Sequence, residues 1–304
     1  MPWFISTRHL GWNEAFSVTD EDFSVTEPEL TADDLLVVDD PYFSADTVAI
    51  VTGAGSGIGQ AAAVGLAANG LTVAGLDVDT DGLEETAELA DAMGVDGQVT
   101  PIPCDLTDDV EVEAAVDEAA AAGDLRFVAN IAGLQHISPL DQFPMKQYDL
   151  LQSVMLRAPF LVSKLAMPHI KATDDGVGAI GNMSSIHGHY ATKDKAAYIA
   201  TKFGLRGLTQ AIAAEGDGVL RSFSVSVGYV LTPLMVNQIE DTARERGISE
   251  RAVVEDVMLG QARTKEMMTP AEVANLFTFG FSRHGRHLNG GDLLWDGGYT
   301  LTYE

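Results

Sequence analysis

The chain has 304 residues, of which 46% are hydrophobic and 21% charged, a composition typical of a globular protein with a large core. Asp and Glu total 45 against 18 Lys and Arg, which gives a formal net charge of -27. Because nucleic acids and anionic membrane surfaces are bound through clustered cations, this balance argues against both as partners.

Two explanations account for the acidic excess. Self-repulsion at this charge is screened in concentrated salt, where the Debye length falls to about 3 Å near 1 M. A halophilic protein of a salt-rich cytoplasm therefore fits the sequence, and an ordinary acidic mesophilic protein is the alternative. We expect a cytoplasmic location because the single cysteine, Cys104, cannot form an internal disulfide and fits a small buried hydrophobe. We also expect no signal peptide and no apolar stretch as long as a membrane span.

Residues 1–46 form an acidic N-terminal extension with 11 acidic residues and one basic residue, Arg8. Such a composition is typical of a disordered tail. Its aromatic residues favour the alternative, in which part of the segment packs on the body or on a neighbouring subunit. These residues are Trp3, Phe4, Trp12, Phe16, Phe23, Tyr42 and Phe43.

Residues 47–304 alternate short apolar runs with longer helical patterns and are expected to form one domain. Strands are predicted at 47–52, 71–76, 99–103, 125–129, 177–182, 219–227 and 293–295. Helices are predicted at 57–69, 81–93, 108–122, 145–170, 195–214 and 270–281. This alternation indicates an α/β fold: a single Rossmann-type, doubly wound parallel sheet with helices on both faces. The apolar strands fit burial on both faces of that sheet.

A glycine-rich turn follows the first strand, with the sequence Thr52-Gly53-Ala54-Gly55-Ser56-Gly57-Ile58-Gly59. Glycines permit a tight turn and let backbone N–H groups approach a pyrophosphate, which the helix N-terminus also favours. A plain turn is the alternative, but the position in a βαβ unit favours a dinucleotide site. Asp77 ends the second strand, where it can bind ribose hydroxyls and repel a 2'-phosphate, so we expect NAD rather than NADP. Asp105, after the third strand, is placed to bind the adenine amino group.

Ser185, Tyr198 and Lys202 are the candidate catalytic residues. Tyr198 and Lys202 are four residues apart on one predicted helix face, and Ser185 follows the fifth strand. Ligands bind at the carboxyl ends of such strands, so the three can converge beside a nicotinamide. A free tyrosine has a pKa of about 10, and a nearby ammonium stabilises its phenolate. Tyr198 can then exchange a proton with a substrate hydroxyl that Ser185 also binds. An incidental Tyr and Lys on one helix is the alternative.

These motifs resemble the short-chain dehydrogenase/reductase family over about residues 47–300. Asn130-Ile131-Ala132-Gly133 resembles the Asn-Asn-Ala-Gly that follows the family's fourth strand, and Asp296-Gly297-Gly298 is similar to its usual ending. The resemblance implies an NAD-dependent alcohol dehydrogenase that assembles as a homotetramer. It implies cofactor contacts from Gly53, Ser56, Gly57, Ile58, Gly59, Asp77, Asp105, Leu106, Asn130, Ala132, Gly133, Tyr198, Lys202 and Thr232.

Within the family, residues 133–139, 185–188, 195–198 and 230–234 resemble the D-3-hydroxybutyrate dehydrogenases. This resemblance implies reversible oxidation of D-3-hydroxybutyrate to acetoacetate. It also implies a substrate site of Gln135, Ser185, His187, Lys195 and Gln238. Another small hydroxy acid, a sugar alcohol or a ketoacyl substrate is the alternative, and so is a non-catalytic NAD-binding regulatory protein. No metal site is expected, because the histidines show no ligand spacing.

Three positions depart from the family pattern. Met155 stands where the long helix usually carries an Asn that connects the catalytic Lys to solvent through water. Val227-Gly228 replaces a Pro-Gly, and Phe223 aligns with an Asn. Methionine cannot supply the amide hydrogen bonds, so we expect a different or weaker proton relay. All three changes are expected near the nicotinamide pocket.

Overall fold

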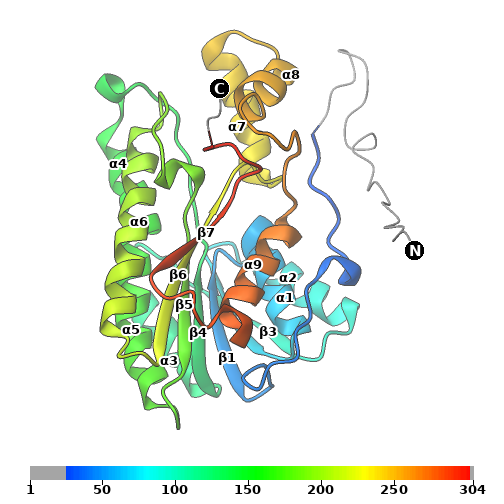
Figure 1. Ribbon diagram of the computed structural model, residues 1–304, viewed down its shortest axis with the longest axis vertical. Coiled ribbons are helices and arrows are strands. Elements are labelled where there is room, and N and C mark those ends of the chain that lie inside the picture. Colours follow the sequence, from blue (N-terminus) through cyan, green and yellow to red (C-terminus); the bar gives the residue numbers. More distant parts are fainter. Residues whose placement is uncertain (1–24, 302–304) are drawn as a thin grey trace, which may run out of the picture.

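The computed structural model describes residues 25–301, so Trp3, Phe4, Trp12, Phe16 and Phe23 lie outside the described residues. Seven parallel strands form one sheet in the order β3-β2-β1-β4-β5-β6-β7 (Figure 1). The strand order reverses between β1 and β4, which is where ligands bind in open α/β sheets. The strands are β1 (Thr47–Thr52), β2 (Thr72–Asp77), β3 (Gln98–Pro103), β4 (Asp124–Asn130), β5 (Gly178–Met183), β6 (Leu220–Val227) and β7 (Gly291–Trp295).

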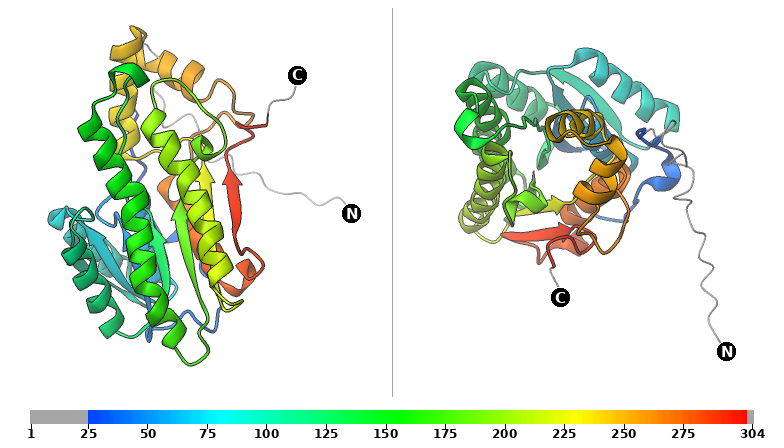
Figure 2. Two further views of the ribbon diagram at one scale, coloured as in Figure 1. Left: turned by 90° about the vertical axis from the view of Figure 1, so that its left-hand side faces the viewer. Right: turned by 90° about the horizontal axis from the view of Figure 1, so that it is seen from above.

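Helices cover both faces of the sheet. Side chains of α1 (Gly57–Ala68), α2 (Thr80–Met93) and α9 (Pro270–Phe281) share one apolar core with the sheet. Those of α3 (Asp109–Ala121), α5 (Ala158–Ala172) and α6 (Ala196–Glu215) share the core on the other face. The two long helices α5 and α6 run side by side in the left panel of Figure 2. The predicted doubly wound parallel sheet is therefore confirmed, and each predicted element begins and ends within two residues of its observed bounds.

The predicted helix over 145–170 is a composite. It consists of α4 (Met145–Gln152), a π-helical turn η3 (Ser153–Arg157) and α5. Pro159 follows the turn and has no N–H to donate to the Met155 carbonyl, which gives a local reason for the altered helical pitch.

The same helix, Met145–Ala172, is long and apolar enough to cross a membrane by length and composition alone. The expectation that no stretch approaches that length was wrong for this element. One face of it lies in the interior of the fold, where Val162, Ala166 and Ile170 are buried in the core on the α3, α5 and α6 side of the sheet.

A helical segment after β6 was not predicted. It comprises α7 (Pro233–Arg246), α8 (Glu250–Ala252) and the π-helical η5 (Val253–Met258), and it lies beyond the carboxyl edge of the sheet (Figure 1). Thr232 begins α7 by accepting a hydrogen bond from the Met235 N–H, and Pro233 occupies the first turn. The segment has an apolar cluster of its own, which includes Met235, Ile239 and Val253.

The described part of the N-terminal extension contacts the body. Leu35 is buried, and Tyr42 and Phe43 pack against the core on the α1 and α9 face. The Tyr42 hydroxyl donates to Asp175 at 2.7 Å, and the Leu36 N–H donates to the Asn275 side chain at 2.7 Å. Of the two alternatives for residues 25–46, packing on the body is the one that the structure shows.

Candidate active site

The glycine-rich turn that joins β1 to α1 leaves no room for a side chain at two of its glycines. Gly53 has a φ of +74°, and a Cβ on it would lie 2.8 Å from the Ala132 Cα. A Cβ on Gly59 would lie 1.8 Å from the Gly53 carbonyl oxygen. Glycine is therefore required at both positions, and the backbone is left open toward the N-terminus of α1, where an anionic pyrophosphate is favoured.

A cleft of about 500 Å³ lies beside this turn at the carboxyl edge of the sheet. Val78 and Thr107, which the sequence did not single out, also line it, and so does Cys104. Cys104 is buried, and burial followed by its acidic neighbours raises the pKa of its thiol to about 11, so it is an inert wall residue. The predicted cofactor residues on the cleft wall are Gly53, Ser56, Gly57, Ile58, Gly59, Asp77, Asp105, Leu106, Ala132, Gly133 and Thr232.

The charged residues of the cleft are both acids. Asp77 accepts hydrogen bonds from the N–H groups of Gly55 and Asp79, each at 3.0 Å, which fix its carboxylate against the glycine turn. Asp105 accepts from the N–H and the hydroxyl of Thr107, each at 2.8 Å, and these bonds lower the pKa of its carboxyl. Among the described residues lining the cleft there is no Lys or Arg. A nicotinamide dinucleotide fits this cleft.

Asn130 does not line the cleft. It is buried at the end of β4, where its amide donates to the Asn182 side chain at 2.9 Å across to β5. From this position it ties the two strand ends together beneath the cofactor cleft.

A second cavity, of about 130 Å³, is called the catalytic cavity below. It is lined by Ser185, Tyr198 and Lys202, which the sequence spacing predicts to lie together. Lys202 donates to the Met183 carbonyl at 2.7 Å, and its Nζ lies 5.3 Å from the centroid of the Tyr198 ring. Burial lowers the pKa of Lys202 to about 7. Burial also raises the pKa of Tyr198, while its hydrogen bond with the Ser185 side chain lowers it. The phenol of Tyr198, the hydroxyl of Ser185 and the amine of Lys202 therefore lie side by side in one cavity. Proton exchange with an alcohol requires such a set.

The four predicted carboxylate-binding residues line the same catalytic cavity: Gln135, His187, Lys195 and Gln238. His187 is buried, and neither ring nitrogen has a hydrogen-bond partner. Burial, followed by the charge of Lys195, lowers its pKa to about 3, so the imidazole is neutral. Lys195 is 8% exposed, and burial, followed by the charge of Arg246, lowers its pKa to about 8.

No Asp or Glu lines this cavity among the described residues. The cavity therefore holds a buried cation and an unsatisfied imidazole without an anion to match them, which is an unusual cost in a folded protein. Tyr229, which the sequence did not single out, lies with its ring centroid 5.7 Å from the Lys195 Nζ. A ligand carboxylate would satisfy the groups that the protein leaves unmatched.

The three departures from the family pattern have different surroundings. Met155 is fully buried in η3, where its Sδ accepts from the Leu134 N–H at 3.3 Å and its side chain packs with Tyr198. Val227 and Gly228 line the catalytic cavity. Phe223 lines neither that cavity nor the cleft. The expectation that it lies near the nicotinamide pocket was wrong, because its ring is buried among Phe277 and Phe281 in the core.

Together, the fold and the site define an oxidoreductase with a nicotinamide cofactor. The cleft and the catalytic cavity share Ile58, Gly133 and Thr232 in their walls, so a dinucleotide in the cleft reaches the Ser185–Tyr198–Lys202 set.

Comparisons with known proteins agree with this class. The family model described as enoyl-(acyl carrier protein) reductase matches residues 53–300. The D-beta-hydroxybutyrate dehydrogenase of Rhizobium meliloti is 35% identical over 258 residues, covering 83% of this chain and 98% of its own. The D-threitol dehydrogenase of Mycolicibacterium smegmatis is 33% identical and covers 84% and 93%. The chain belongs to the short-chain dehydrogenase/reductase family.

A solved structure gives the same fold. It is a putative NAD(P)-dependent gluconate 5-dehydrogenase from Beutenbergia cavernae with NADP bound at low occupancy. It superposes with a TM-score of 0.75 at 28% identity, covering 86% of this chain and 100% of its own. The names of these relatives span a hydroxy acid, a polyol and a sugar acid, and two cofactors, so substrate and cofactor are argued from the site itself.

Proposed function

We propose that the protein oxidises a small hydroxy acid with NAD, and that D-3-hydroxybutyrate, giving acetoacetate, is its substrate. The observation that carries this proposal is the catalytic cavity with Lys195 buried, His187 unpartnered and no carboxylate in its wall. A four-carbon acid suits a cavity of about 130 Å³. Similarity to the Rhizobium meliloti enzyme supports the same substrate.

In the proposed reaction the substrate carboxylate binds Lys195, and its hydroxyl lies between Ser185 and Tyr198. Tyr198 accepts the hydroxyl proton while the carbon gives up a hydride, so the alcohol becomes a ketone. NAD, when bound, supplies the hydride acceptor. Lys202 stabilises the phenolate of Tyr198. Met155 adds no polar group beside this set, so the proton leaves Tyr198 by a route other than the relay usual in the family.

NAD is proposed over NADP because of the charges in the cleft. Asp77 sits at the end of β2 with its carboxylate against the glycine turn, where it would repel a 2'-phosphate. The described cleft wall offers no cation to bind such a phosphate. Competing turnover with the two cofactors tests this choice, and equal values of kcat/KM would contradict it.

Two other functions remain to be distinguished. A polyol substrate has no charge, so its turnover would not depend on Lys195. A non-catalytic NAD-binding role is favoured by Met155 alone, and it conflicts with the assembled Ser185–Tyr198–Lys202 set. NAD binding without turnover of any hydroxy acid would select that role.

The test is NADH formation from D-3-hydroxybutyrate in low and in multimolar salt. Turnover by the wild type that Tyr198→Phe abolishes, with a raised KM in Lys195→Ala, supports the proposal. Absence of turnover at every salt concentration, with NAD still bound, would overturn the assigned substrate. Higher activity in multimolar salt would support the proposed halophilic, cytoplasmic setting.

We also propose that the protein is a homotetramer. Phe160 on α5 and Phe203 on α6 are 58% and 46% exposed, and Trp295 on the edge strand β7 is 54% exposed. Contact between copies through α5 and α6, and through the edge strand β7, would cover these side chains and give the two interfaces that a tetramer needs. Light scattering in molar salt measures the mass directly, and a monomer would contradict the proposal.

A further inference from the structure

A further hollow of about 470 Å³, called the chamber below, adjoins the catalytic cavity. The two share Lys195, Tyr229 and Gln238 in their walls, so these three side chains form the partition between them. The chamber lies between the loop before α6 and the α7–η5 segment. A four-carbon substrate held between Tyr198 and Lys195 in the catalytic cavity leaves this larger chamber unused.

The chamber has aromatic walls and cations. The rings of Tyr190 and Tyr229 lie 5.7 Å and 6.0 Å from that of Tyr299 between centroids. Tyr299 is buried and the other two rings are partly buried, and aromatic faces of this kind suit a methylene chain.

Arg246, at the end of α7, is the cation that matters for an anionic ligand in the chamber. It is close enough to Lys195 for its charge to depress the Lys195 pKa. The other charged residues of the chamber wall are Lys193, Glu245 and Asp256, and all three are exposed, as is Arg246. In a chain with 45 acids and 18 cations, a chamber lined by three cations and two acids is locally enriched in positive charge.

We propose that the chamber receives the tail of a longer hydroxy acid, and that Arg246 binds the terminal carboxylate. This inference rests on the proposed function. The substrate class is CH3–CH(OH)–(CH2)n–COO⁻, in which 3-hydroxybutyrate is the shortest member. The reacting end is common to the series and stays at Ser185 and Tyr198. As n increases, the carboxylate passes Lys195 and reaches Arg246. The reaction is unchanged: the alcohol becomes a ketone, one hydride goes to NAD, and one proton goes to Tyr198.

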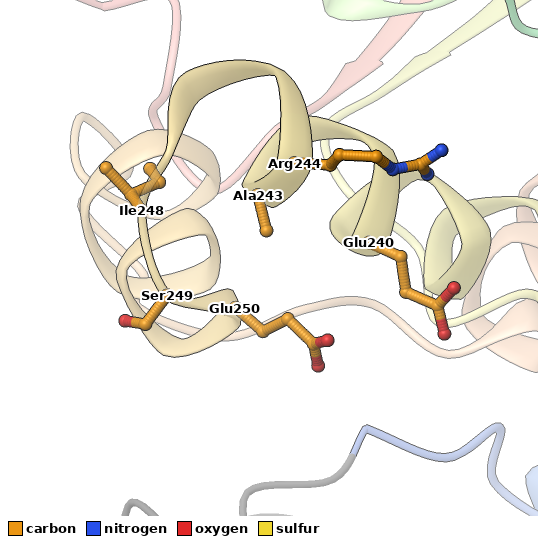
Figure 3. Close-up of a pocket in the computed structure, with 6 residues that line it drawn as sticks. All are labelled: Glu240, Ala243, Arg244, Ile248, Ser249 and Glu250. Atoms are coloured by element: carbon orange, nitrogen blue, oxygen red, sulfur yellow. The ribbon is translucent and has the colours of Figure 1, made fainter.

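The helix α7 supplies a matched control. Arg244 lies two residues before Arg246 but lines a separate hollow between α7 and α8 with Glu240 and Ile248 (Figure 3). It is already paired with Asp241. Arg244→Ala therefore removes the same charge from the same helix without touching the chamber.

The experiment measures kcat/KM across the series from one to four methylenes, in the wild type, Arg246→Ala and Arg244→Ala. We expect the wild type to use the longer members at least as well as 3-hydroxybutyrate. Arg246→Ala should lower kcat/KM by about tenfold for the longer members, because the loss of one modest charge contact corresponds to about that factor. For the shortest member the loss should be less than about twofold, since its carboxylate does not reach Arg246. Arg244→Ala should change neither. Turnover of 3-hydroxybutyrate alone, or an equal loss for every chain length in Arg246→Ala, would overturn the inference.

A binding measurement separates this inference from the proposed function. Butyrate and heptanoate carry no hydroxyl, so their binding to the NADH-loaded protein does not need the reaction. Heptanoate binding that weakens in Arg246→Ala, with butyrate binding unchanged, supports the chamber even if no hydroxy acid is turned over. Equal heptanoate binding by the wild type and Arg246→Ala overturns it, whatever the activity.

Discussion

Replacing Lys195 with Met should stabilise the free protein and weaken substrate use. Lys195 is 8% exposed, and its pKa falls from 10.5 to about 8, chiefly through burial. At about 1.4 kcal/mol for each pKa unit, the charged form costs the fold about 3 kcal/mol. Because the pKa is lower in the folded than in the unfolded protein, this cost is fully present below pH 8. It disappears as the pH rises through 10.5.

Met has a similar length without the charge, so Lys195→Met should raise the free energy of unfolding by up to about 3 kcal/mol at neutral pH. The gain over the wild type should shrink as the pH approaches 10.5. A substrate carboxylate that pairs with Lys195 recovers the same energy, so kcat/KM for D-3-hydroxybutyrate should fall on the order of 100-fold.

Denaturant unfolding of the cofactor-free protein at neutral and alkaline pH measures the first effect, and initial rates of NADH formation measure the second. Lys193→Met is the matched control, because Lys193 is exposed and does not line the catalytic cavity. It should change the unfolding free energy by less than about 0.5 kcal/mol, as surface substitutions usually do. A Lys195→Met protein that unfolds no later than the wild type at neutral pH, or that keeps its kcat/KM, would refute the reasoning.

Three further outcomes are expected. Tyr198→Phe removes the proton acceptor and should lower kcat by roughly 10²–10⁴-fold with NAD affinity retained in a titration; unchanged kcat would remove Tyr198 from the reaction. Asp77→Asn removes the charge that would face a 2'-phosphate, so the ratio of kcat/KM for NAD to that for NADP should fall about tenfold or more. An unchanged ratio would show that Asp77 does not select the cofactor. Gly59→Ala would put a methyl group 1.8 Å from the Gly53 carbonyl oxygen, so the turn must move and NAD affinity should be lost in a calorimetric titration; wild-type affinity would contradict the role of that turn.

The sequence alone determined the sheet, the helices that cover it and the candidate catalytic residues. Apolar runs and helical periodicity are local properties, so the seven strands and the helices that cover the sheet were predicted within two residues of their observed bounds. The spacing of Ser185, Tyr198 and Lys202 was sufficient to bring them together, because strand ends of a parallel sheet share one edge. Local patterning failed in the segment after β6, where α7 and α8 are polar in sequence and the segment is stabilised by a small apolar cluster of its own.

Only the tertiary structure decided what surrounds the chemical groups. It placed Phe223 in the core away from the site, and it put Asn130 beneath the cleft. It also showed that Lys195 separates two cavities and that Arg246, 51 positions later in the chain, acts on it. Burial, the absence of a matching carboxylate and the shared wall all depend on contacts between residues distant in sequence. No pattern within a single helix or strand encodes such contacts, and the charge and length of the substrate proposed for the site rest on them.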